Sequence, residues 1–314
     1  MKPIEILQHQ LNLPSLEQPL DFLSTDDCQV TMKRDDLIHP WISGNKWRKL
    51  KYNLLNAVKE GKQRIVTFGG PFSNHLVAVA ASCQLLKVEC QGIVRGVELD
   101  PNNMTLNLCR KLGMKIRLLH PDEYALRYDV DWQNSHINDV EGLLIEEGGS
   151  SGLFEKGVKE IFTEVESDVD YIVLPIGTGG TMYGLTQNSQ GTKIIGISPF
   201  KKDRVNIPFL NLIKAPNQIL FDYAMKGYGR YSRELVDFIN MMWDKYEIPL
   251  DPIYNAKGLI ALKDLLAKGY FSRGSKIIYL HTGGLQGIEG FNYVNRQKQK
   301  IMIPRNIYFP ITDQ

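Results

Sequence analysis

The chain has 314 residues, of which 43% are hydrophobic, and its 37 Lys and Arg residues nearly balance its 35 Asp and Glu residues, for a net charge of +2. This balance, without a long basic run, argues against a nucleic-acid partner, and no stretch approaches the roughly 20 apolar residues of a membrane span. The first ten residues carry Glu5 and Gln8 and do not read as a signal peptide, and the four scattered cysteines predict a reducing, cytoplasmic location.

Short β-rich runs alternate with stretches of helical spacing along the chain. This alternation predicts an α/β protein in which mostly parallel sheets are flanked by helices. A glycine-rich turn at 146–152 marks a crossing between parts of the chain, so we expect two lobes rather than two independent domains. The predicted strands are 65–68, 88–94, 115–119, 171–176, 193–198 and 276–281.

A helix is predicted to begin at Asn45 as N-cap, because Trp47, Leu50 and Leu54 then share one face. Lys46 lies in the first turn, off this apolar stripe, where the helix dipole lowers the pKa of an amine. A lowered pKa suits a lysine that forms a Schiff base or acts as a base. From this segment alone, an ordinary solvated basic face remains the alternative.

Two glycine-containing turns, each joining a strand to a helix, are candidate anion sites. In the first, Ser73 or Asn74 opens a helix before His75, and the exposed N–H groups and hydroxyl suit a carboxylate. In the second, residues 177–181, backbone N–H groups and threonine hydroxyls suit a phosphate. Plain capped turns without a ligand are the alternative for both.

Two later segments offer a phenol and a hydroxyl. Tyr254, within residues 251–258, suits proton transfer, and Thr282, within residues 281–284, suits a hydrogen bond to a heterocycle. Taken alone, both segments are typical of turns.

In this order, the segments resemble the 1-aminocyclopropane-1-carboxylate (ACC) deaminase/D-cysteine desulfhydrase family of pyridoxal-phosphate (PLP) enzymes. The resemblance runs from Lys33 to Gly284 and implies the two-lobed tryptophan-synthase β-like fold, fold type II, with the cofactor in the cleft. It further implies a large domain of residues 1–50 and 150–314, a smaller α/β domain of residues 51–149, and a homodimer. The matching motifs are Lys33-Arg34-Asp35-Asp36, Gly44-Asn45-Lys46 with Arg48-Lys49-Leu50, Gly69-Gly70 with Ser73-Asn74, Gly177-Thr178-Gly179 with Thr181, Tyr228-Gly229, and Asp251-Pro252 with Tyr254 and Lys257.

The resemblance also implies a role for each matching residue. Lys46 would be the Schiff-base lysine and, with Ser73, Tyr228 and Tyr254, would carry the catalysis. Substrate would be bound by Ser73, Asn74 and His75, and no metal is expected. The remaining cofactor contacts would come from Asn74, Gly177, Thr178, Gly179, Gly180, Thr181, Asn255 and Thr282.

Three departures from the family bear on the substrate. Asn255 stands where ACC deaminases have a glutamate against the pyridine nitrogen, and a neutral amide cannot supply that charge. The segment that contains Thr282 resembles the corresponding segment of the desulfhydrases. Phe72 stands where the family usually has glutamine and makes the carboxylate pocket more apolar. We therefore predict a PLP-dependent lyase or deaminase that, like D-cysteine desulfhydrase, converts a small amino acid by β-elimination into pyruvate, ammonia and sulfide.

Two alternatives stay open. One is ACC deaminase, or another D- or L-amino acid lyase on the same scaffold. The other, from a different class, is a non-catalytic nucleotide- or cofactor-binding protein.

Overall fold

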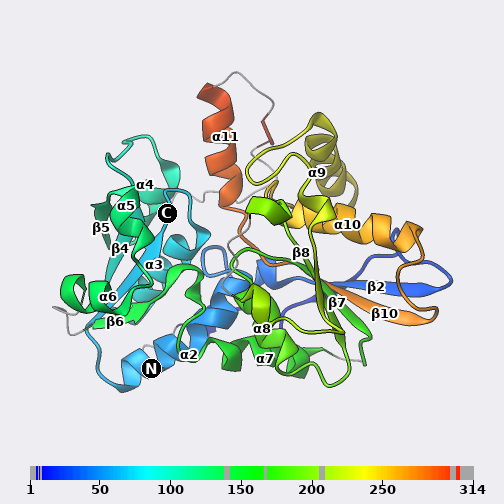
Figure 1. The fold of residues 1–314 in the computed structure, drawn as a ribbon, viewed down its shortest axis with the longest axis horizontal. Coiled ribbons are helices and arrows are strands. Elements are labelled where there is room, and N and C mark those ends of the chain that lie inside the picture. Colours follow the sequence, from blue (N-terminus) through cyan, green and yellow to red (C-terminus); the bar gives the residue numbers. More distant parts are fainter. Residues whose placement is uncertain are drawn as a thin grey trace.

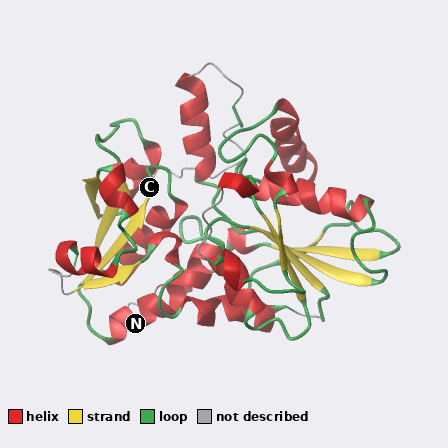
Figure 2. Ribbon diagram, viewed as in Figure 1, coloured by secondary structure: helices red, strands yellow, loops and turns green. Residues whose placement is uncertain are grey.

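The computed structural model describes residues 5, 7, 9–137, 142–165, 168–204, 209–297 and 302–304. In this part of the chain, two sheets lie side by side with helices on their faces (Figures 1 and 2). One sheet has six strands in the order β1-β2-β10-β7-β8-β9, and the other has four in the order β5-β4-β3-β6. Neighbouring strands are parallel except for the antiparallel β1–β2 pair. The predicted α/β architecture is confirmed.

All six predicted strands are present. Four further strands escaped prediction because β1 and β9 are three residues long, β6 is four, and β2 mixes polar with apolar side chains. The strands are β1 (Glu17–Pro19), β2 (Cys28–Lys33), β3 (Arg64–Gly69), β4 (Glu89–Arg95), β5 (Met114–Leu119), β6 (Gly142–Ile145), β7 (Tyr171–Pro175), β8 (Lys193–Ile197), β9 (Gln218–Leu220) and β10 (Ser275–Leu280).

Helices cover both faces of each sheet, so each lobe has its own apolar core. In the larger lobe one core lies under α9 and α10 and another under α7 and α8, whereas α2, α3 and α4 cover the smaller sheet on one face. The α-helices are α2 (Asn45–Lys59), α3 (Asn74–Leu86), α4 (Met104–Lys111), α5 (Pro121–Ala125), α6 (Val130–His136), α7 (Phe154–Glu164), α8 (Gly180–Thr186), α9 (Arg233–Tyr246), α10 (Asn255–Ala267) and α11 (Gly287–Gln297). The 3₁₀ turns are η1 (Asp35–Leu37), η2 (Glu147–Gly149), η3 (Lys202–Arg204), η4 (Leu210–Leu212) and η5 (Asp222–Ala224).

The strands of the smaller sheet all fall between residues 64 and 145, and the larger sheet takes strands from both sides of this range. The domain boundaries at residues 50 and 150 stay a prediction. No helix of the described residues is long and apolar enough to cross a membrane.

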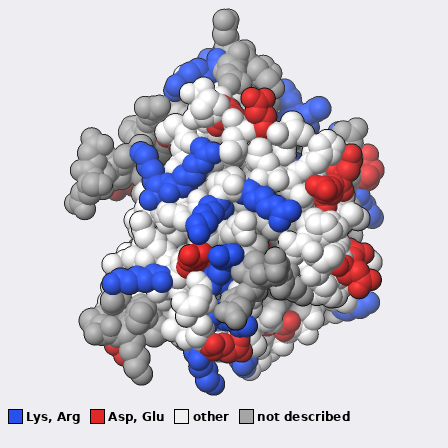
Figure 3. Space-filling view, turned by 90° about the vertical axis from the view of Figure 1, so that its left-hand side faces the viewer, with Lys and Arg blue, Asp and Glu red and all other residues white. Residues whose placement is uncertain are grey.

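The surface on the side of the four-stranded sheet mixes the two signs of charge. Figure 3 shows Lys and Arg side chains there among uncharged side chains and among Asp and Glu. On the sheet itself, Glu89 pairs with Arg64 at 3.1 Å and with Lys115 at 3.2 Å.

Helix α2 carries the predicted lysine motif and is buried on more than its apolar face. Trp47, Leu50 and Leu54 are buried as predicted, but Arg48 and Lys49 are buried as well. The residue at the N-cap is Gly44, not Asn45. Only glycine fits at this position, because a Cβ at Gly44 would lie 2.0 Å from the carbonyl oxygen of Thr282. The start of α2 therefore packs directly on the segment after β10.

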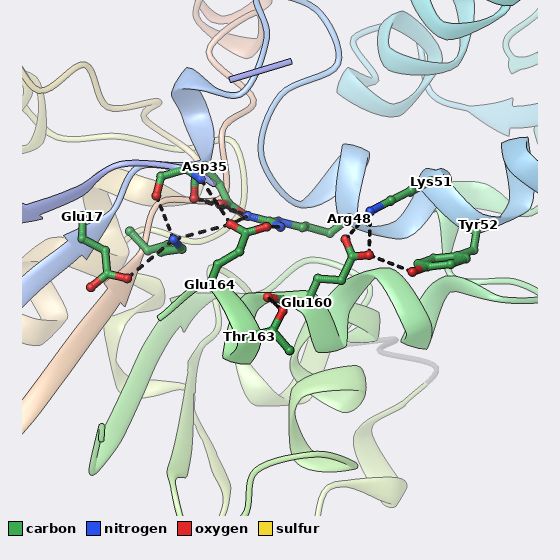
Figure 4. Close-up of polar contacts among 10 residues, drawn as sticks. Glu17, Asp35, Arg48, Lys51, Tyr52, Glu160, Thr163 and Glu164 are labelled. Carbon is green, nitrogen blue, oxygen red and sulfur yellow. Dashed lines mark hydrogen bonds and ion pairs between the residues drawn. The ribbon is translucent and has the colours of Figure 1, made fainter. Parts of the chain in front are cut away.

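A buried ion network fixes α2 against α7 (Figure 4). The guanidinium of Arg48 donates to both carboxylate oxygens of Asp35, at 2.8 and 3.0 Å, and to Glu164 on α7. Lys33 lies 3.5 Å from the same Glu164 carboxylate. The two helices also approach closely, since a Cβ at Gly157 would lie 1.9 Å from the carbonyl oxygen of Arg48.

Candidate active site

A cavity of about 470 Å³ is lined by both lobes, a size typical of small-molecule sites. Of the thirteen residues predicted for the site, all but Asn255 line it. They are Lys46, Ser73, Asn74, His75, Gly177, Thr178, Gly179, Gly180, Thr181, Tyr228, Tyr254 and Thr282.

Lys46 reaches the cavity from the first turn of α2. Its Nζ donates to Asn45 Oδ1 at 2.8 Å. Burial lowers the pKa of Lys46 to about 8, and the carboxylate of Asp251 opposes part of that shift. The amine is therefore neutral far more often than an exposed lysine near neutral pH.

Lys49, one helical turn further on, is a second cation of the cavity that the sequence analysis did not single out. It is buried, and its Nζ donates to Ser150 Oγ at 3.1 Å. Burial and the charge of Lys46 hold the pKa of Lys49 well below its ordinary value. The sequence signal for a cavity position of Lys49 was its spacing of three residues from Lys46, because residues three apart in a helix lie on the same face.

The loop from Gly177 to Thr181 fits a phosphate. Gly179 has a φ of 86°, and Gly180 has no room for a side chain, because its Cβ would lie 2.0 Å from Ser150 Oγ. The buried hydroxyl of Thr181 has no hydrogen-bond partner among the described residues. Backbone N–H groups, an unpartnered hydroxyl and the nearby Lys49 amine together form a donor set for an anion.

Ser73 and Asn74 lie at the start of α3, on the smaller lobe. Ser73 caps the helix, its Oγ accepting from the N–H of Leu76 at 3.4 Å, so its hydroxyl proton remains available. Asn74 packs on the turn after β10: a Cβ at Gly284 would lie 2.7 Å from Asn74 Nδ2. Asn74 Oδ1 is buried without a partner among the described residues.

Two tyrosines from the larger lobe lie in contact with each other in the cavity lining, with their ring centroids 6.1 Å apart. Tyr254 donates to the hydroxyl of Tyr228 at 3.3 Å, and Tyr228 is half exposed. Burial, followed by the proximity of Tyr228, raises the pKa of Tyr254 well above its ordinary value, so this phenol keeps its proton. Lys257, buried on α10, donates to the carbonyls of Ala224 and Gly227 at 3.1 and 2.7 Å and thereby anchors the turn that carries Tyr228.

Asn255 lies behind the cavity wall, and Thr282 occupies the wall itself. The Asn255 amide donates to Asp251 Oδ2 at 2.8 Å and to the Gly283 carbonyl at 2.9 Å. Its oxygen accepts from the Thr282 N–H at 3.1 Å and from the Thr282 hydroxyl at 3.4 Å. Both amide hydrogens are engaged, so Asn255 has no donor left for a ligand and instead orients Thr282.

Phe72, the third departure, lines the cavity and rests on α11. A Cβ at Gly290 would lie 2.6 Å from Phe72 Cδ1, and the ring centroids of Phe72 and Tyr293 are 6.4 Å apart. An apolar ring therefore separates the start of α3 from α11, where a glutamine would add a polar group.

Comparison with known proteins identifies the family. Residues 11–283 match the family of pyridoxal-phosphate dependent enzymes. A Pyrococcus horikoshii protein, provisionally named 1-aminocyclopropane-1-carboxylate deaminase, is 30% identical over 86% of this chain and 90% of its own length. The 1-aminocyclopropane-1-carboxylate deaminase of a Bradyrhizobium species (strain BTAi1) is 26% identical over 85% of this chain and 90% of its own.

Comparison with solved structures supports the same family. The crystal structure of an ACC deaminase homologue has a TM-score of 0.74 and 27% identity, covering 95% of this chain and 98% of that one. A hydrogen sulfide-producing enzyme from Fusobacterium nucleatum has a TM-score of 0.63 at 13% identity, covering 91% and 98%, and supports the fold alone. These matches show an enzyme rather than a non-catalytic binding protein. The chain therefore belongs to the ACC deaminase/D-cysteine desulfhydrase family of fold type II enzymes, whose cofactor is pyridoxal phosphate.

Proposed function

We propose that this enzyme catalyses β-elimination from a small amino acid, as D-cysteine desulfhydrase does, with pyruvate, ammonia and sulfide as products. The observation that carries the proposal is the neutral Thr282 hydroxyl on the cavity wall, held by Asn255. Bound PLP withdraws electrons from the substrate, most strongly when an acid protonates its ring nitrogen. Asp251 also lines the cavity, but its carboxylate already accepts from the N–H groups of Ile253, Tyr254 and Asn255 and from the Asn255 amide.

A neutral hydroxyl suits elimination of a good leaving group. Loss of hydrosulfide from the β-carbon needs little electron withdrawal by the cofactor ring. Opening a cyclopropane that has no acidic α-hydrogen needs much more. This difference supports elimination over ring opening.

Lys46 is assigned as the lysine that binds the cofactor covalently and, once freed by substrate, removes the α-hydrogen. Its lowered pKa makes a neutral amine available for both tasks. The N–H groups and hydroxyls of the 177–181 loop would hold the cofactor phosphate, with the amine of Lys49 as a further donor. This assignment uses the Thr181 hydroxyl, which has no hydrogen-bond partner among the described residues.

The substrate carboxylate would rest at the start of α3, on the hydroxyl of Ser73 and the amide of Asn74. Helix N-termini favour anions there. Tyr254 keeps its proton, and its O–H would turn from the hydroxyl of Tyr228 to the leaving group to donate that proton.

ACC deamination is the second candidate, favoured by the names of the relatives and of the similar crystal structure. Elimination from another D- or L-amino acid is the third. An assay of oxo-acid release separates them: we expect pyruvate with sulfide from D-cysteine, and slower or no pyruvate from L-cysteine and D-serine. Release of 2-oxobutyrate from ACC at a rate matching that of pyruvate from D-cysteine would contradict the proposal.

Covalent attachment has its own test. Borohydride reduction of the purified enzyme, followed by peptide mass mapping, is expected to find the pyridoxyl group on Lys46. Lys46→Ala is expected to lose the label and the activity, and Lys51→Ala, a matched lysine on the same helix that does not line the cavity, is expected to keep both. A label on Lys49 would refute the assignment.

We also propose a cytoplasmic homodimer with domain boundaries near residues 50 and 150. The four cysteines are all free and buried, which suits a reducing compartment. Sedimentation of the purified enzyme is expected to give twice the 35.8 kDa of the chain. A species at the mass of one chain would contradict the dimer.

A further inference from the structure

The turn after β10, formed by Thr282 and Gly283, is held mainly by two buried side chains. The Thr282 N–H donates to Asn255 Oδ1 at 3.1 Å, and the Gly283 carbonyl accepts from Asn255 Nδ2 at 2.9 Å. The Gly283 N–H donates to His281 Nδ1 at 3.2 Å. The fourth backbone group, the Thr282 carbonyl, accepts from the N–H of Asn45 at 3.3 Å. Asn255 and His281 therefore supply three of the four partners of the turn.

The contacts of His281 fix which of its ring nitrogens carries the proton. Nε2 lies 2.7 Å from the carbonyl oxygen of Pro249, which can only accept, so Nε2 must donate. Nδ1 receives the N–H of Gly283, which can only donate, so Nδ1 must be a bare acceptor. The buried ring of His281 is therefore neutral, with its proton on Nε2.

One carboxylate lies close to this ring and is already balanced. Asp36 Oδ1 is 3.5 Å from His281 Nδ1, beyond the usual range of a hydrogen bond. The two oxygens of Asp36 accept from the Arg34 guanidinium at 2.9 and 2.8 Å. Because Arg34 supplies the counter-charge, Asp36 does not require a protonated His281.

His281 joins the Thr282 turn to the segment that carries Tyr254. Pro249 lies two residues before Asp251, whose carboxylate accepts from the Tyr254 N–H at 2.8 Å. His281 is not among the residues that line the cavity, so it contacts neither a substrate nor a cofactor there. Loss of its Nδ1 would leave the Gly283 N–H without a partner, and an unpaired buried donor is costly.

We propose that His281 is a positioning residue that acts on the reaction through the Thr282 hydroxyl. As a neutral acceptor at Nδ1, it fixes the Gly283 N–H and, with it, the direction in which Thr282 presents its hydroxyl to the cavity. The inference rests on the proposed role of Thr282.

Two substitutions of His281 each keep one of its two hydrogen bonds. His281→Asn retains an oxygen near the position of Nδ1 for Gly283 but gives up the bond to Pro249. His281→Gln retains an amide donor near the position of Nε2 for Pro249 but gives up the bond to Gly283. Each variant leaves one buried group unpaired, so we expect the melting temperature to fall by a similar amount in both.

The two variants are expected to differ in catalysis. His281→Gln should lower kcat by roughly tenfold, the worth of about one hydrogen bond, and shift the visible band of the bound cofactor. His281→Asn should keep kcat within about twofold of the wild type, because it still holds Gly283. Equal losses of kcat in both variants would show that His281 only stabilises the fold.

A double substitution tests whether His281 acts through Thr282. Once Thr282→Val has removed the hydroxyl, adding His281→Gln is expected to lower kcat by less than about twofold further, since residues that act together are not additive. In Thr282→Ser, which keeps the hydroxyl, His281→Gln should still cost the full, roughly tenfold loss. A full additional loss in the Thr282→Val background would overturn the proposal.

The position of the proton can be measured without any variant. Neutron diffraction from crystals of the wild-type holoenzyme is expected to find a deuteron on Nε2 of His281 and none on Nδ1. A deuteron on Nδ1 would refute the inference even if no variant folded.

Two outcomes tell the failure of the inference from that of the proposed function. If the wild type releases no pyruvate from D-cysteine, the proposed function fails, and the neutron data still decide the tautomer of His281. If Thr282→Val lowers kcat while His281→Gln does not, the inference alone is wrong.

Discussion

The amine of Lys46 is the group whose chemistry depends most on burial. With a pKa of about 8 in place of 10.5, the amine is half neutral near pH 8 and almost fully neutral only about one to two pH units above it. Only the neutral amine attacks an aldehyde, so PLP attachment to cofactor-free enzyme is expected to accelerate about tenfold per pH unit below pH 8 and to level off above. Stopped-flow absorbance of the visible band measures this rate. A rate still rising steeply toward pH 10 would mean an ordinary lysine pKa.

The hydroxyl of Thr282 is expected to contribute more to catalysis than the volume of the Thr282 side chain. Thr282→Val keeps the shape but removes the hydroxyl that Asn255 orients, leaving the Asn255 oxygen with the Thr282 N–H alone. We expect kcat for elimination to fall roughly tenfold, the worth of about one hydrogen bond, and the visible band of the bound cofactor to shift. Thr282→Ser, which retains the hydroxyl, serves as control. Equal kcat and spectra in both variants would exclude a role for this hydroxyl.

At the scale of elements, helix α2 offers an internal comparison between a buried and a peripheral ion pair (Figure 4). Arg48→Ala would leave Asp35 and Glu164 without their guanidinium, whereas Lys51→Ala removes a partly exposed partner of Glu160. We expect the free energy of unfolding to fall by about 3–5 kcal/mol in the first and by under about 1 kcal/mol in the second. Urea titration followed by circular dichroism provides the measurement. Similar losses in the two variants would show that burial does not govern the network.

The same helix shows how far sequence reasoning reaches. Its apolar face was predictable because Trp47, Leu50 and Leu54 follow helical periodicity, a local property. The burial of Arg48 could not be predicted from the sequence, because its partner Glu164 is 116 residues away in the chain. The direction of the Asn255 amide was likewise not predictable, because it depends on Gly283 and Thr282, which lie outside any local pattern.

At the scale of the whole molecule, the site exists only where the two lobes meet. Helix α3 of the smaller lobe brings Ser73 and Asn74, and the larger lobe brings the 177–181 loop and Tyr254. The contact of Asn74 with the Gly284 turn already joins the two sides. The resemblance to the family implied a site in the cleft between two lobes, whereas the strand pattern alone could not bring together loops from two separate sheets.

A ligand that fills such a cavity stabilises the whole chain, because it binds the folded state alone. At a PLP concentration of a hundred times its dissociation constant, the gain is about 2.7 kcal/mol, which raises the melting temperature by several degrees. We expect this shift in the wild type and in Lys51→Ala, measured by calorimetry with and without PLP. Lys46→Ala keeps the phosphate loop but not the covalent bond, so its shift should be clearly smaller at the same PLP concentration. An undiminished shift in Lys46→Ala would mean that binding of the cofactor owes little to this lysine.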